Sequence, residues 1–118
     1  MSVHQDYVVQ QGTSGIWTYR KWNSGIAECW GIYKFQLNLV EQFQNVWAGH
    51  SFTLNLPSGL FVSTTSFSDT CVQMTTDNLW SASCYILNSN EIGVKCFSGY
   101  KYQNAGVYVF ISIKGRWQ

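Results

Sequence analysis

The feature that most constrains the fold is a series of short runs rich in β-branched and aromatic residues. Gly, Ser and Asn separate these runs at regular intervals, and proline occurs only once in 118 residues. Strand-forming runs at this spacing, with no helical pattern between them, are typical of antiparallel sandwiches and barrels. The sequence therefore predicts an all-β fold, an antiparallel β-sandwich. We expect a single domain over residues 12–118, preceded by an N-terminal arm of residues 1–11.

The clearest predicted element is a hairpin near the N-terminus. Residues 16–22 form its first strand, residues 23–25 its turn and residues 26–35 its return strand. A three-residue loop that ends in glycine fits a type I turn with the glycine in the left-handed region. This register places Arg20 opposite Glu28, where we expect the two charges to pair. It also sets two further pairs opposite each other: Tyr19 with Cys29, and Trp17 with Gly31.

The tryptophans of this hairpin divide between its two faces. Because side chains alternate along a strand, Trp17 lies on one face and Trp22 and Trp30 lie on the other. We expect one face to meet the core of the domain and the other to meet a second subunit.

The rest of the chain contains further strand-like runs. They cover residues 51–56, 60–67, 71–76, 79–87, 92–97 and 107–113, with turns at residues 57–59 and 88–90. The last run is the strongest, because β-branched residues alternate along it: Val107, Val109, Ile111 and Ile113. Residues 37–48 carry a weak helical period, and we assign them to a loop or a short strand.

Charge and cysteine content exclude several classes of function. Charged residues make up 11 % of the chain and the net charge is +1, so we expect neither a nucleic-acid nor an anionic-membrane partner. No apolar run is long enough to span a bilayer, and no signal peptide is evident, which predicts synthesis in the cytoplasm. The four cysteines lie within strand-like runs without a CxxC or Cys/His cluster. Free thiols and no metal or cofactor are therefore expected, and one disulfide between neighbouring strands stays open.

Catalytic residues are scarce, and we do not expect an enzyme. The two histidines, His4 and His50, lie outside any nucleophile motif. A glycan hydrolase needs two converging carboxylates, and the chain has six acidic residues. Convergence of two of them, such as Asp69 and Asp77, is an alternative that a cleavage assay would test.

Aromatic residues beside amides are the best candidates for a binding site. Aromatic side chains make up 17 % of the chain. A ring covers the apolar face of a sugar while Asn, Gln and Asp orient its hydroxyl groups. Two short segments have this chemistry and supply the candidate ligand-binding residues: Tyr100, Tyr102 and Asn104 in one, and Asp77 and Trp80 in the other. The alternative for each ring is packing in the core or in a contact between subunits.

Two segments resemble a known family. Residues 12–31 read GTSGIWTYRKWNSGIAECWG, with a W-x-Y-x-K-W strand, a short glycine turn and a strand that ends E-x-W-G. This resembles the opening hairpin of the C-terminal tip domain in tail-fibre and baseplate proteins of bacteriophages and prophages of Gram-positive bacteria. Residues 111–117, ISIKGRW, are similar to the closing strand of such domains. Residues 36–106 carry no resemblance.

The resemblance implies a homotrimer of β-sandwiches at the distal end of a virion tail, made in the bacterial cytoplasm. It implies recognition of a host-cell surface glycan, with residues 1–11 as the remnant of a stem. The resemblance does not identify ligand-binding residues in this chain, because in that family they lie in the part of the domain whose sequence varies. A free-standing carbohydrate-binding module, or lectin-like protein, is the alternative, and it would use the same aromatic chemistry without a virion.

Overall fold

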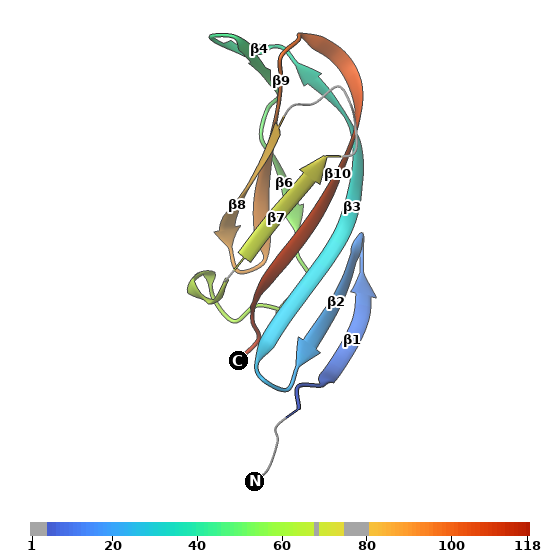
Figure 1. The fold of residues 1–118 in the computed structure, drawn as a ribbon, viewed down its shortest axis with the longest axis vertical. Helices are drawn as coiled ribbons and strands as arrows, with labels where there is room; N and C mark the ends of the chain where they lie inside the picture. The colour runs from blue at the N-terminus through green and yellow to red at the C-terminus, as the bar shows by residue number, and fades with distance from the viewer. Residues whose placement is uncertain (1–4, 68, 75–80) are drawn as a thin grey trace.

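The computed structural model describes residues 5–67, 69–74 and 81–118, with residues 69–74 described by their backbone. The described chain forms strands in two antiparallel sheets and contains no α-helix (Figure 1). The all-β, sandwich-like fold expected from the sequence is confirmed.

The first sheet is built around two long strands. Its order is β1 (Val8–Ser14), β2 (Trp17–Trp22), β3 (Ile26–Leu39), β10 (Tyr102–Arg116) and β7 (Asp69–Met74). β3 and β10 pair along almost their whole length, from Ile26 opposite Arg116 to Leu39 opposite Tyr102. These two strands therefore connect the two ends of the molecule.

The second sheet consists of shorter strands arranged around β9. Its members are β4 (Glu41–Phe43), β5 (Val46–Ala48), β9 (Glu91–Ser98), β6 (Phe52–Asn55) and β8 (Ser81–Asn88). β8 pairs along one edge of β9, while β6 and β5 share the other edge. A short 3₁₀ helix, η1 (Thr64–Ser66), lies between β6 and β7.

The core lies between the two sheets. The predicted apolar face of the last strand is confirmed, because alternate residues from Val107 to Ile113 on β10 are fully buried. They pack with inward-facing residues of β9 and with the segment that follows β6. The other fully or nearly fully buried members are Trp17, Ala27, Cys29, Leu39, Leu54, Leu56, Leu60, Phe61, Ile92, Val94, Cys96 and Ala105.

The predicted N-terminal hairpin is confirmed in register. Arg20 lies opposite Glu28, Tyr19 opposite Cys29 and Trp17 opposite Gly31. Gly25 has a φ of 93°, as a left-handed turn position requires, and its N–H donates to the carbonyl of Trp22.

The expected ion pair between Arg20 and Glu28 does not form. The Arg20 Nε donates to Oε1 of Gln11 at 3.2 Å, and its guanidinium lies 5.0 Å from the ring centroid of Trp30. Oε1 of Glu28 instead accepts a hydrogen bond from the indole of Trp22 at 3.1 Å. Each charged side chain therefore interacts with neighbouring aromatic or amide groups and not with the other charge.

The tryptophans divide between the faces as predicted. Trp17 points into the core with 2 % of its surface exposed, and its indole N–H donates to the carbonyl of Asn55 at 2.6 Å. Trp22 and Trp30 are half-buried on the outer face of the first sheet.

Three further expectations need correction. Residues 60–67 do not form a strand: they turn through bends and η1, with Ser66 Oγ donating to the carbonyl of Ser63. Residues 37–48 contain more strand than expected, because β3 runs to Leu39 and a β4–β5 hairpin follows. β1 begins at Val8, so residues 8–11 of the expected arm pair with β2.

The described cysteines are free thiols, as predicted: Cys29, Cys84 and Cys96. Burial raises the pKa of Cys29 to about 12, with smaller contributions from Cys84 and Glu28. Burial also raises the pKa of Cys96 to about 11. These thiols therefore stay protonated at neutral pH, where they behave as small apolar side chains.

The molecule is elongated, with principal extents of 59 × 26 × 22 Å. β4 and the β9–β10 connection lie at one end (Figure 1, top). The start of β1, the β2–β3 turn and the C-terminal end of β10 lie toward the other end. The two ends are therefore separated by the full length of the long strands.

Candidate functional site

The structure brings three of the predicted ligand-binding residues together. Tyr100, Tyr102 and Asn104 lie in or next to the β9–β10 connection, at the end of the molecule away from β1 (Figure 1). The other two predicted residues, Asp77 and Trp80, lie outside the described residues.

Aromatic rings gather at this end, and we call Phe43, Trp47, Tyr100 and Tyr102 the aromatic tip. Tyr100 is 65 % exposed and Phe43 is 51 % exposed, whereas Tyr102 packs partly against the core. The rings of Tyr100 and Tyr102 meet edge to face, with centroids 6.4 Å apart and an interplanar angle of 74°. The tip therefore presents ring surface to solvent on a partly buried base.

Two lysines cover rings of the aromatic tip. Nζ of Lys101 lies 5.6 Å from the centroid of Trp47, and Nζ of Lys95 lies 5.0 Å from the centroid of Phe43. Ammonium groups over ring faces at this distance are weakly attractive. The tip thus combines apolar ring surface with positive charge.

Polar groups also lie beside the rings. The backbone N–H of Asn104 donates to Oδ1 of Asn38 at 2.7 Å, and Asn104 has a φ of 57°. Asparagine tolerates this left-handed conformation better than most residues, because its short polar side chain bonds locally. In the second sheet, Nδ1 of His50, which follows β5, lies 3.5 Å from Oε1 of Glu41 on β4, and both side chains are exposed.

Sequence reasoning missed Phe43 and Trp47 as members of the tip. Both fall in the segment with a weak helical period, which obscured the β4–β5 hairpin that carries them. The pairing of Trp47 with Ser98 joins this hairpin to β9 and so to the β9–β10 connection. A contact across about fifty residues leaves no local signal in the sequence.

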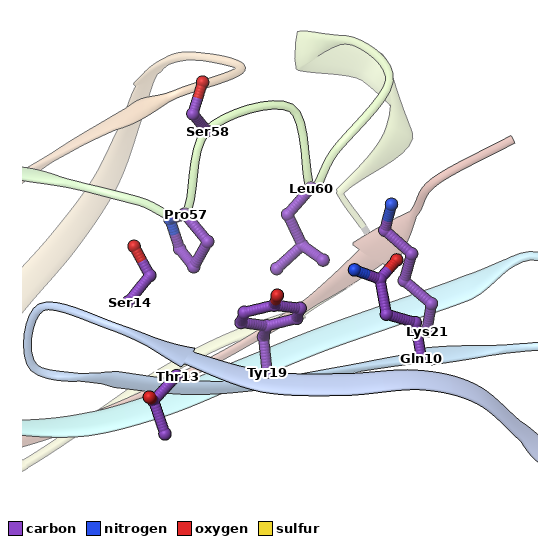
Figure 2. Close-up of a pocket in the computed structure, with 8 residues that line it drawn as sticks. All are labelled: Gln10, Thr13, Ser14, Tyr19, Lys21, Pro57, Ser58 and Leu60. Atoms are coloured by element: carbon purple, nitrogen blue, oxygen red, sulfur yellow. The ribbon is translucent and has the colours of Figure 1, made fainter.

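A concave feature, which we call the side pocket, lies between β1, β2 and the turn after β6 (Figure 2). Its volume is about 290 Å³. It is lined by Gln10, Thr13, Ser14, Tyr19, Lys21, Pro57, Ser58 and Leu60. In Figure 2 the Tyr19 ring lies beneath Leu60, Gln10 and Lys21 lie beside each other, and the Thr13 side chain points away from Leu60.

Gly12 allows the Tyr19 ring to lie close against β1. A Cβ on Gly12 would lie 2.7 Å from Oη of Tyr19, which is closer than real Cβ contacts allow. Gly12 and Tyr19 are directly opposite each other in the β1–β2 ladder. The bare glycine therefore makes room for the ring at the pocket wall.

The four carboxylates with described side chains each have a partner. Glu28 accepts from Trp22, and Glu41 lies against His50. Asp6 accepts from Ser24 in the β2–β3 turn, and Glu91 accepts from Asn88 across the β8–β9 turn. In the described part of the chain, no group of three or more His, Cys, Asp or Glu side chains is placed to hold a metal ion. The described residues also include no helix long and apolar enough to cross a membrane.

Comparison with known proteins adds no relative: no protein-family model, curated protein sequence or solved structure matches this chain.

Proposed function

We propose that this chain is the receptor-binding tip domain of a bacteriophage tail fibre, which recognises host-cell surface polysaccharide as a homotrimer. The observation that carries the proposal is the place of the aromatic tip. It lies at the end of a 59 Å long molecule opposite to β1, the strand that a stem would precede. A fibre joined there would project the tip away from the virion.

The chemistry of the tip suits a glycan. Exposed ring surface at Tyr100 would cover the apolar face of a sugar, and the amide of Asn104, near the start of β10, would orient its hydroxyl groups. Lys101 adds a positive charge beside Trp47. Each site would be weak alone, but three sites on one rigid trimer would raise avidity by about 10²–10⁴.

The outer face of the first sheet supports the trimeric part of the proposal. Ile32 and Tyr108 are each 47 % exposed there, on neighbouring strands. Ile32 lies directly opposite Phe110, which is half-buried. Apolar side chains on a sheet face are what a contact between copies of the chain would cover.

The test combines a binding assay with a measurement of mass. The probes are cell-wall polysaccharides purified from a panel of Gram-positive bacteria and immobilised on an array. We expect binding to a subset of the panel, and we expect Tyr100→Ala to weaken it by about tenfold or more. The matched control is Tyr7→Ala, because Tyr7 is 60 % exposed at the opposite end and should leave binding unchanged.

Light scattering separates the proposal from its alternative. A trimer that binds polysaccharide through the tip supports the tail-fibre proposal. A monomer that binds through the same residues supports a free-standing carbohydrate-binding module instead. A chain that binds no polysaccharide of the panel, or loses binding equally in Tyr7→Ala, contradicts both.

A further inference from the structure

We infer that the side pocket is a second ligand site, which takes a single acidic sugar unit such as a hexuronate. It lies between the N-terminal hairpin and the turn after β6, apart from the aromatic tip (Figures 1 and 2). The inference does not depend on the proposed function.

The walls of the pocket offer mostly neutral hydrogen-bonding groups. Gln10 contributes an amide, Ser14 and Ser58 contribute hydroxyl groups, and Tyr19 contributes a phenol. Leu60, which is buried, supplies an apolar wall above the Tyr19 ring in Figure 2. Several neutral polar groups around a small apolar surface match a sugar ring, which carries hydroxyl groups on its rim and C–H groups on its faces.

The charge of the pocket indicates an anionic ligand. Lys21 is the one charged residue among those that line it. Its Nζ lies 5.4 Å from the ring centroid of Trp117, and among the described side chains it has no ion-pair partner. A cation held in place beside uncharged donors and acceptors favours one carboxylate on the ligand.

The size of the pocket limits the ligand to one unit. Its volume of about 290 Å³ is at the lower end of the range for small-molecule sites. A single sugar ring with its acidic group fits such a space, whereas a bound oligosaccharide would extend beyond the eight residues of the wall.

The test is a titration of ¹⁵N-labelled protein followed by NMR, with glucuronate, glucose and inorganic phosphate as probes. We expect glucuronate to shift the backbone amide signals of Gln10, Ser14 and Ser58. Glucose, which has the same ring without the carboxylate, should bind about tenfold more weakly or worse. Phosphate alone should also bind more weakly, because it lacks the ring.

Two variants and a matched control test whether the NMR shifts come from binding in the side pocket. Lys21→Gln should weaken glucuronate binding by about tenfold or more and leave glucose binding unchanged. Gln10→Ala should weaken both sugars by a similar factor. The control is Lys34→Gln, because Nζ of Lys34 also lies over a ring, 5.1 Å from the centroid of Tyr108, but on the outer face of the sheet.

Each outcome decides the inference. Absence of shifts at the pocket with glucuronate, or equal loss in Lys34→Gln, overturns it. Equal affinity for phosphate overturns the assignment to a sugar. The tip variant Tyr100→Ala should leave glucuronate binding at the pocket intact. The experiments therefore test the ligand site in the side pocket and the polysaccharide site at the tip independently.

Discussion

Aromatic side chains at the two ends of the molecule differ in how they are held and in how far they are exposed. At the end formed by β1, β2, the start of β3 and the end of β10, which we call the hairpin end, indole N–H groups donate hydrogen bonds. Three of them donate to oxygens: Trp17 to the carbonyl of Asn55, Trp22 to Glu28, and Trp117 to the carbonyl of Trp22. At the aromatic tip, Nζ of Lys95 lies over the exposed ring of Phe43, Nζ of Lys101 lies over the half-buried ring of Trp47, and the exposed ring of Tyr100 meets Tyr102 edge to face.

This difference explains how a chain with few charges holds so many aromatic side chains. At the hairpin end, Trp17 bonds β2 to β6 of the second sheet, and Trp117 bonds the C-terminal end of the chain to β2. Removal of either ring should therefore lower the stability of the fold. Exposed rings at the tip contribute little burial, so their removal should cost binding and leave the fold intact.

The largest expected effect follows from Trp17→Ala. Trp17 is 2 % exposed and bridges the two sheets through the carbonyl of Asn55, so the variant loses both core packing and a hydrogen bond. We expect the free energy of unfolding to fall by about 3–5 kcal/mol, measured by urea denaturation. The comparison is Tyr100→Ala at the tip, which should change it by less than about 0.5 kcal/mol. Similar losses in the two variants would contradict the division between the ends.

An intermediate effect is expected at alkaline pH, from thiols in both sheets. Burial raises the pKa of Cys29, on β3, to about 12 and that of Cys96, on β9, to about 11, from a value of 9.0. The unfolded chain releases these protons first, so the stability that the neutral thiols contribute is present below pH 9.0 and is lost as the pH rises through 11 to 12. Each thiol should contribute a slope of about 1.4 kcal/mol per pH unit in that window.

Urea denaturation at several pH values between 9.0 and about 11 measures this slope. The variants Cys29→Ala and Cys96→Ala should each be less sensitive to alkali than the unaltered chain, whatever their stability at neutral pH. Because both thiols lie in the shared core, we expect similar reductions from the two sheets. A reduction in only one variant would show that the sheet with the other thiol opens before its thiol ionises.

Local patterns in the sequence predicted the hairpin end well. The register of β2 and β3 follows from one glycine turn and from alternation, both of which lie within a few residues. The run from Val107 to Ile113 was equally clear, since a buried face repeats every second residue. The Ser- and Thr-rich segment of residues 60–67 misled the prediction, because Ser66 bonds its own turn instead of supporting a strand.

Contacts between distant segments were beyond such patterns. The position of the aromatic tip depends on two strand pairings. β3 pairs with β10, for example at Leu39 and Tyr102, and β5 pairs with β9. The side pocket depends on a turn at residues 57–60 that lies over β1 and β2. The sequence pattern pointed to Tyr100, Tyr102 and Asn104 because they are neighbours in the chain. It missed Phe43 and Trp47, which join them only through the fold.

The smallest expected effect distinguishes a hydrogen bond from ring packing at the hairpin end. Trp117→Phe keeps an aromatic ring near Lys21 and removes the N–H that donates to the carbonyl of Trp22 at 2.8 Å. We expect a loss of about 1 kcal/mol in the free energy of unfolding, with polysaccharide binding at the tip unchanged. Unchanged stability would mean that packing alone fastens the C-terminal strand to the hairpin. A loss of binding at the tip would mean instead that the two ends are coupled along β3 and β10.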